Sequence, residues 1–177
     1  QDLPPSPALS IVANGPQSLA GRKLGLLVTD GTDADLFLAL VEQATREGAV
    51  YEVVAPVIGG VTLSDGRALA AKHKIDGGAS VLFDAVAVIP STEGVQMLLG
   101  DKPSLDFVSD AYGHCKFIGL SEGGTALMAA AGLGDKLDEG CLALTAAGDA
   151  AGFVAACAPL RHWPRELPTD LDSAALQ

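Results

Sequence analysis

Residues 116–128, KFIGLSEGGTALM, are the stretch on which the fold prediction rests. The apolar run Phe117–Leu120 predicts a buried strand, Ser121–Gly124 predict a tight turn, and the residues that follow predict the first turns of a helix. A strand, a turn and a helix in this order are where α/β enzymes hold an exposed nucleophile. The side chain at this turn is therefore the first candidate for catalysis.

The segments around this stretch alternate between apolar runs of strand length and amphipathic runs of helix length. This alternation predicts an α/β fold, a three-layer α/β/α sandwich with a mostly parallel central sheet, flavodoxin-like in outline. Asp33 is the expected N-cap of the first helix and Gly48 its C′ glycine. Strands are expected over 22–29, 50–55, 84–90, 117–120 and 141–145, and helices over 34–47, 92–99, 104–113, 125–131 and 149–160.

Residues 57–83 interrupt the alternation. The segments VIGGVTL and ALAA flank SDGR, whose Asp-Gly pair is a turn signal, so we expect a small hairpin insertion here and a loop over HKIDGGASVLF. Residues 1–21 hold four prolines without periodicity and predict a linker or extended arm that follows an earlier part of a longer chain. The flavodoxin-like domain is expected over 22–163 and an extended tail over 164–177.

Length and composition narrow the classes of function. The chain has 177 residues, 49% hydrophobic and 19% charged, which favours one packed domain. Its formal net charge of −11 argues against nucleic acid and against an anionic membrane as partners, because both require a basic surface. The chain begins with Gln1 rather than Met, so an upstream signal would not be visible and no localisation is inferred.

The cysteines and histidines do not form a metal-binding pattern. The three cysteines are odd in number and fit neither a disulfide framework nor a zinc site, so we expect reduced packing residues. The three histidines are dispersed and are expected at the surface or at helix caps. These residues are Cys115, Cys141, Cys157, His73, His114 and His162.

An acidic turn, Asp30–Asp35, follows the first strand. Asp30, Asp33 and Asp35 would repel a phosphate at the helix start, which argues against nucleotide or flavin phosphate binding. A Mg²⁺ pocket would require a further acid at the end of the third strand, where Pro90-Ser91 stand, with Glu93 two residues on. We therefore expect helix capping and no metal site.

The central turn can be interpreted in two registers. In the first, Gly119–Gly123 match G-x-S-x-G, and Ser121 would be the nucleophile of an α/β-hydrolase. Asp138 or Asp149, followed by His162, would complete the triad in that family's order. The segment PSTE after the third strand offers no glycine-rich oxyanion loop, and three fixed positions match easily by chance in a chain with 21 glycines.

The second register comes from a resemblance. KLGLLVTDGTDADLF, LFDAVAVIPSTEG and KFIGLSEGGTALM together resemble the PfpI-like branch of the class I glutamine-amidotransferase-like superfamily. That resemblance places Asp33 at the branch's acidic position, Glu122 where the nucleophilic Cys stands, and Gly123 where the His stands, with Gly124 matching the Gly. A carboxylate cannot form the thioester or hemithioacetal of thiol chemistry.

The resemblance therefore implies a degenerate elbow without a catalytic residue. Glu122 occupies the nucleophile position, with Ser121 and Gly123 beside it and Asp33 as the degenerate acid. Cys115 is expected before the strand, at the opposite end of the sheet. A PfpI-like thiol or glyoxalase-type enzyme and a G-x-S-x-G serine hydrolase are the alternatives.

A narrower resemblance covers nearly the whole chain. PSPALSIVANGP, GRKLGLLVTDGTDADL, VIGGVTLSDG, KIDGGASVLFDAVAV, GHCKFIGL and LRHWPRE together look like the C-terminal domain of large-subunit haem catalases. The resemblance implies a parent chain that decomposes hydrogen peroxide with haem in a separate core, and no cofactor in this domain. It also implies the catalase core and neighbouring subunits of a homotetramer as partners. The expected role is tetramer stabilisation or control of access to the core. The acidic, small-apolar composition adds the hypothesis of chaperone-like binding to unfolded client proteins.

Overall fold

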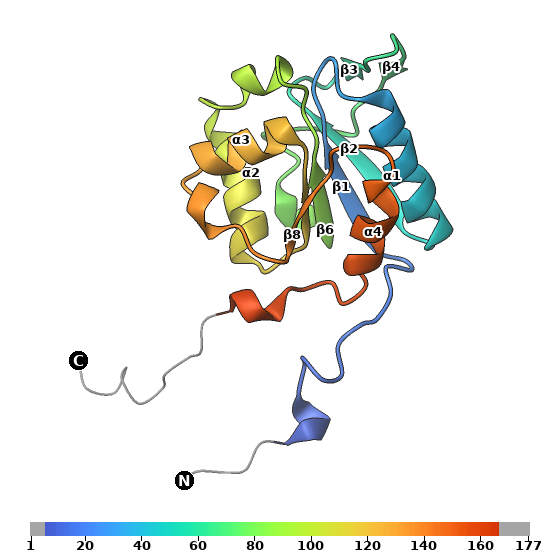
Figure 1. The fold of residues 1–177 in the computed structure, drawn as a ribbon, viewed down its shortest axis with the longest axis vertical. Coiled ribbons are helices and arrows are strands. Elements are labelled where there is room, and N and C mark those ends of the chain that lie inside the picture. The colour runs from blue at the N-terminus through green and yellow to red at the C-terminus, as the bar shows by residue number, and fades with distance from the viewer. Residues whose placement is uncertain (1–5, 167–177) are drawn as a thin grey trace, which may run out of the picture.

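The computed structural model describes residues 6–166 and contains a six-stranded sheet between two layers of helices (Figure 1). The strand order is β5-β2-β1-β6-β7-β8, and every pair of neighbours in this sheet is parallel. The predicted α/β sandwich with a parallel, flavodoxin-like sheet is confirmed. The strands are β1 (Lys23–Leu27), β2 (Val50–Ala55), β5 (His73–Lys74), β6 (Ala85–Val88), β7 (Ile118–Leu120) and β8 (Cys141–Ala143).

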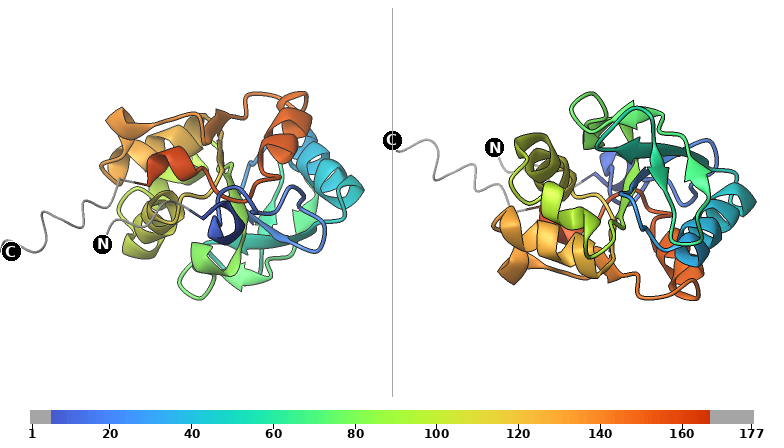
Figure 2. Two further views of the ribbon diagram at one scale, coloured as in Figure 1. Left: turned by 90° about the horizontal axis from the view of Figure 1, so that it is seen from below. Right: turned by 90° about the horizontal axis from the view of Figure 1, so that it is seen from above.

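Two pairs of helices cover the two faces of the sheet. Helices α1 (Ala34–Arg46) and α4 (Asp149–Ala156) lie side by side on one face, and α2 (Lys102–Gly113) and α3 (Glu122–Ala130) on the other (Figures 1 and 2). Each pair encloses its own apolar cluster against the sheet. Because both faces are covered, β6 and β7 consist of apolar residues throughout, and β1 is buried after the exposed Lys23 at its start, as is typical of parallel sheets.

Local capping explains where the first two long helices begin. The Asp33 carboxylate accepts a hydrogen bond from the amide of Leu36 at 2.8 Å, and Gly48 has a φ of 73° just after α1. Both predicted capping residues are confirmed. The Asp101 carboxylate caps α2 through the amide of Ser104 at 3.1 Å, so this helix begins two residues before the predicted start at 104.

Several predicted helix boundaries were wrong. The helix expected over 92–99 is a 3₁₀ turn at Gly94–Met97. Helix α4 ends at Ala156 instead of residue 160. Helix α3 begins at Glu122 rather than at 125, because Ser121 caps it, so the predicted turn residues belong to the first helical turn. The remaining 3₁₀ turns are Pro7–Leu9, Ser80–Leu82, Gly134–Lys136 and Trp163–Arg165.

The predicted hairpin insertion is present, and a short strand follows it. Strands β3 (Val61–Thr62) and β4 (Ala68–Leu69) pair antiparallel around the Asp-Gly turn. The segment HKIDGGASVLF was expected to be a loop, but its first two residues, His73–Lys74, form β5 and pair with Val54 and Ala55. Two residues are too short for periodicity to reveal a strand.

Each predicted terminal segment contacts the body where it joins it, through Leu19 and Gly21 at one end and Arg165 at the other. Leu19 is buried, and the amide of Gly21 donates to the carbonyl of Gly48 at 2.9 Å. Residues 1–5 of the predicted arm and 167–177 of the predicted tail lie outside the described residues. The division at residues 21 and 163 stays a prediction. None of the helices between residues 6 and 166 combines the length and apolar character that crossing a membrane requires.

Candidate functional site

A cleft of about 360 Å³ lies at the carboxyl ends of the central strands, where open α/β sheets bind ligands. The structure brings the predicted site residues Asp33, Ser121, Glu122 and Gly123 together in its wall. The cleft is lined by Gly31, Asp33, Leu36, Ile89, Pro90, Ser91, Thr92, Glu93, Ser121, Glu122, Gly123, Leu144 and Thr145.

Ser121 serves as the N-cap of α3. Its Oγ accepts a hydrogen bond from the amide of Gly124 at 3.2 Å and donates one to the carbonyl of Pro90 at 3.1 Å. Its φ of −71° and ψ of 179° are ordinary extended values. Among residues 6–166, the non-glycine residues with positive φ are Cys115 and Leu160. The strained turn of a nucleophile elbow is therefore not formed at Ser121.

Glu122 is the first residue of α3, and two glycines follow it because the helix start lies against β6. A Cβ on Gly124 would come within 2.2 Å of the carbonyl oxygen of Val88, and one on Gly123 within 2.7 Å of that of Pro90. Both glycines are therefore required by close packing. Glu122 itself lies in the cleft wall, with its carboxylate at the positive end of the α3 dipole.

The acidic residues after β1 have structural partners. The Asp30 carboxylate accepts a hydrogen bond from the amide of Thr62 at 2.7 Å, which ties the hairpin to the main sheet. Asp33 caps α1, and Asp35 lies in its first turn. Within the described part of the chain, no group of three His, Cys, Asp or Glu residues is arranged to hold a metal ion.

A hydroxyl network that the sequence analysis missed joins the ends of β1 and β6 below the cleft. The amide of Ser91 donates to Thr29 Oγ1 at 3.0 Å, and Ser91 Oγ donates to the carbonyl of Asp30 at 2.6 Å. Ser91 Oγ also accepts from the amide of Gly94 at 2.8 Å. Thr29 at the end of one predicted strand and Ser91 directly after another are the signal that could have indicated it.

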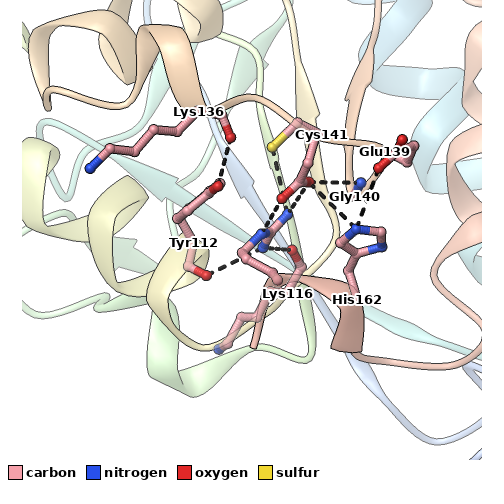
Figure 3. Close-up of polar contacts among 9 residues, drawn as sticks. Tyr112, Lys116, Lys136, Glu139, Gly140, Cys141 and His162 are labelled. Carbon is pink, nitrogen blue, oxygen red and sulfur yellow. Dashed lines mark hydrogen bonds and ion pairs between the residues drawn. The ribbon is translucent and has the colours of Figure 1, made fainter. Parts of the chain in front are cut away.

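His162 lies at the other end of the sheet, which excludes the predicted Ser-His-Asp triad. Figure 3 shows the imidazole beside Glu139 and Gly140, in the loop that leads into β8. Its Nε2 is 3.9 Å from Asp138 Oδ1, and its backbone amide donates to the carbonyl of Cys115. Since Ser121 follows the carboxyl end of β7, the two side chains cannot meet. The triad predicted from the G-x-S-x-G register is therefore not formed.

The three cysteines are free thiols, and none lines the cleft. Cys115 is buried at the amino end of β7, where its Sγ lies 3.5 Å from Glu166 Oε2. Burial, and then the neighbouring Glu166, raise the pKa of the Cys115 thiol. Burial likewise raises the pKa of Cys141 and Cys157. None of the three is set up as a thiolate nucleophile.

Arg165 fastens the C-terminal 3₁₀ turn to the body through a cluster that the sequence analysis did not foresee. Its side chain is 5% exposed and donates to both carboxylate oxygens of Asp138, each at 2.7 Å. The guanidinium also donates to the carbonyl of Lys116 at 2.8 Å and lies 4.2 Å from the ring centroid of Tyr112. Figure 3 shows Tyr112, whose hydroxyl donates to the carbonyl of Lys136. We call Arg165, Asp138 and Tyr112 the C-terminal clasp.

A family model and several known proteins match this chain over most of its length. The family model of the C-terminal domain found in long catalases matches residues 20–166. Catalase C of Rhizobium meliloti is 48% identical over 166 residues, covering 94% of this chain and 24% of that protein. Catalase HPII of Mycobacterium avium is 36% identical over 181 residues, covering 93% of this chain and 26% of that protein. The chain thus spans about a quarter of the length of these relatives.

Solved structures with a similar fold belong to the DJ-1/PfpI group. A two-domain protein from Anabaena variabilis with DJ-1/ThiJ/PfpI-like and ferritin-like domains has a TM-score of 0.65 at 15% identity, covering 76% of this chain and 46% of that one. DJ-1 of Schizosaccharomyces pombe has a TM-score of 0.62 at 17% identity, covering 86% of this chain and 95% of that one. At these identities the likeness concerns the fold alone.

Proposed function

Because this chain belongs to the family of C-terminal domains found in long catalases, we propose that it is the non-catalytic C-terminal part of a haem catalase that decomposes hydrogen peroxide to water and oxygen. The observation that carries the proposal is Glu122 at the elbow. A carboxylate at the start of α3 replaces the nucleophile, and Ser121 beside it is engaged as a helix cap. Haem and the peroxide chemistry belong to the rest of the parent chain.

The absence of a nucleophile can be tested by covalent labelling. We expect no labelling of the chain by a fluorophosphonate, and slow labelling by iodoacetamide, because two of the three thiols are buried and all three have a raised pKa. A Glu122→Cys variant is the positive control, because it places a thiol in the cleft wall at a helix N-terminus. Rapid fluorophosphonate labelling that Ser121→Ala removes would contradict the proposal.

In the parent catalase, the domain's role is to support assembly around the core. The described chain enters and leaves the body at the amino ends of the strands, away from the cleft (Figure 1). The side of the domain at the amino ends of the strands would then lie against the core and the neighbouring subunits of a homotetramer. The domain would then stabilise the tetramer and influence access to the core without taking part in the reaction.

This role is tested by removing residues 20–177 from the full-length parent protein. We expect the haem absorbance and the turnover per haem to persist at moderate temperature, and the tetramer to dissociate at a lower temperature than the intact protein. Loss of turnover with tetramer and haem both intact would show that the domain contributes to the reaction itself.

A second candidate is chaperone-like binding of unfolded client proteins, and one surface favours it. A groove of about 190 Å³ runs between Pro56, Ile75 and Met97, with Met97 60% exposed. Val57 and Ile58 follow Pro56 and are also exposed. An excess of the chain should then reduce the aggregation of a heat-labile client, and Met97→Lys should weaken this effect. Unchanged turbidity with the original chain would reject the candidate.

A further inference from the structure

The outer edge of β2 is only partly covered. Strand β5 pairs with Val54 and Ala55, so the amino-terminal half of β2 has a sheet neighbour on the β1 side alone. A groove of about 360 Å³ follows this edge, between Val50–Val53 on one side and Leu69, Ala70 and Lys72 on the other. Val50 is 52% exposed and Tyr51 37% exposed. We call Ala49–Val53 the open edge.

The backbone groups of the open edge can be assigned to one side or the other. The amide of Val50 donates to Arg22, and the carbonyl of Val54 accepts from Val28, so even-numbered residues bond to β1 and odd-numbered residues point outward. The Ala49 amide is already bonded to Ala44, and the Val53 carbonyl accepts from Lys72.

Four outward backbone groups then lack a protein partner among residues 6–166. They are the amide and carbonyl of Tyr51, the amide of Val53 and the carbonyl of Ala49. Unpaired strand edges template pairing with another chain. Prolines and inward-pointing charges commonly block such pairing. The sequence AVYEV contains no proline, and its one charged residue, Glu52, is paired with Lys23 and His73 of the same chain.

We propose that the open edge pairs antiparallel with the open edge of a second copy of this chain, with Tyr51 opposite Tyr51 across a two-fold axis. In this register each Tyr51 exchanges two hydrogen bonds with its counterpart, and each Val53 amide meets the carbonyl of the other copy's Ala49. The two backbone groups that this register leaves out, the Ala49 amide and the Val53 carbonyl, are the two already bonded internally. All four unpaired groups are satisfied, and none is used twice.

The side chains of the open edge also favour pairing with a second copy of the chain. The pairing brings the two Tyr51 rings together on one face of the continuous sheet, and aromatic cross-strand pairs are among the favourable ones. It also covers Val50 on the opposite face, where this residue is 52% exposed.

Charge complementarity supports the register as well. In this register Val53 lies opposite the other copy's Ala49. The amide of Lys72 donates to the carbonyl of Val53, so the Lys72 side chain comes close to the other copy's Glu47. Both side chains are exposed, and neither forms an ion pair within the described residues. The two-fold axis creates this pair twice in each dimer.

Disulfide trapping tests the register. Hydrogen-bonded antiparallel residues have Cα atoms about 5.5 Å apart, a separation that a disulfide spans. Mild oxidation of Tyr51→Cys should therefore give a covalent dimer of the chain. Leu137→Cys is the matched control. Leu137 is 40% exposed and lies in the loop before β8, the strand at the opposite edge of the sheet, so this variant should stay monomeric. Absence of trapping at position 51, or equal trapping in the control, would overturn the proposal.

Charge reversal tests the pairing without a covalent bond. In sedimentation equilibrium over a concentration series, Lys72→Glu and Glu47→Lys should each weaken the dimer about tenfold, because each change makes two attractive pairs repulsive. The double variant should return to within about threefold of the original chain. A chain that stays monomeric throughout, or a dimer that responds to neither single variant, would overturn the proposal.

Discussion

Arg165 and Asp138 form a two-bond ion pair, with Nε 2.7 Å from Oδ2 and Nη2 2.7 Å from Oδ1, that joins the C-terminal 3₁₀ turn to the loop before β8. The pair is largely shielded, with 5% of the Arg165 side chain and 21% of the Asp138 side chain exposed. Such a pair stabilises little relative to an apolar one, but removing one partner leaves a shielded charge unsatisfied. The C-terminal clasp should therefore be sensitive to single substitutions.

Arg165→Ala should lower the free energy of unfolding by about 3 kcal/mol, because Asp138 and the Lys116 carbonyl lose their partner together. Urea unfolding at neutral pH measures the change. Arg46→Ala is the matched control: Arg46 pairs with Glu42 at 2.6 Å, but both side chains are more than 60% exposed. The control should cost less than about 1 kcal/mol. Equal losses in the two variants would contradict the assignment of the clasp.

Acid should weaken the clasp in a defined window. The hydrogen bonds from Arg165 hold the pKa of Asp138 below its usual value of 3.8. A folded-state pKa below the unfolded one gives stability that is complete above pH 3.8 and is lost as pH falls through the folded pKa. Asp138→Asn removes this contribution at every pH. The drop in unfolding free energy between pH 5 and pH 2 should therefore be smaller in the variant. A drop of unchanged size would argue against this role of Asp138.

Lys116 should contribute stability that increases with pH. This lysine is 1% exposed, its ammonium donates to the carbonyls of Ser80 and Phe83, and burial lowers its pKa to about 8. The pKa of Lys116 in the unfolded chain is near 10.5. Between pH 8 and pH 10.5 the unfolded chain therefore binds a proton that the folded chain has lost, and the contribution of Lys116 to the free energy of unfolding rises with pH by up to about 3 kcal/mol.

Lys116→Met should remove this contribution, so the change in unfolding free energy between pH 7.5 and pH 10 should be less favourable in the variant than in the original chain. The raised pKa values of the three thiols act in the opposite direction in both proteins. Comparing the two proteins at pH 7.5 and pH 10 by urea unfolding isolates the contribution, because the other titrating groups are common to both. An identical change in unfolding free energy with pH in the two proteins would show that Lys116 does not make this contribution.

Glycine at the start of α3 should not tolerate a side chain. A Cβ on Gly124 would lie 2.2 Å from the Val88 carbonyl oxygen, which is backbone and cannot move away cheaply. Gly124→Ala should therefore destabilise the chain by about 1–3 kcal/mol through overpacking. Gly152→Ala in α4 is the control: nothing lies within 4 Å of its Cβ position, so alanine should stabilise by about 0.5–1 kcal/mol. Thermal unfolding should shift in opposite directions for the two variants.

Much of the fold follows from local patterns that the sequence displays directly. Helix α1 begins at a carboxylate cap, Asp33, and is followed by a glycine with positive φ, Gly48. Strands β1 and β2, which are mostly apolar, stand on either side of it. Capping and periodicity depend on neighbours within a few residues, so these elements were predicted correctly.

The candidate site was only partly predictable. Ser121, Glu122, Gly123 and Asp33 were expected at the carboxyl ends of the strands, and they do line one cleft. The start of α3 was placed three residues late, because a run of Ser, Glu and two glycines has the composition of a turn. Packing of Gly123 and Gly124 against the end of β6 is what allows these residues to be helical.

The sequence by itself determined the main strands and helices and the caps of α1, and its resemblance to the PfpI-like branch places Glu122 at the nucleophile position. Tertiary structure alone decided that His162 lies at the opposite end of the sheet from Ser121, that Arg165 is shielded beside Asp138, and that half of β2 is left as an open edge. The physical reason is sequence separation. Local signals act over a few residues, whereas these relationships depend on which distant segments the sheet brings side by side.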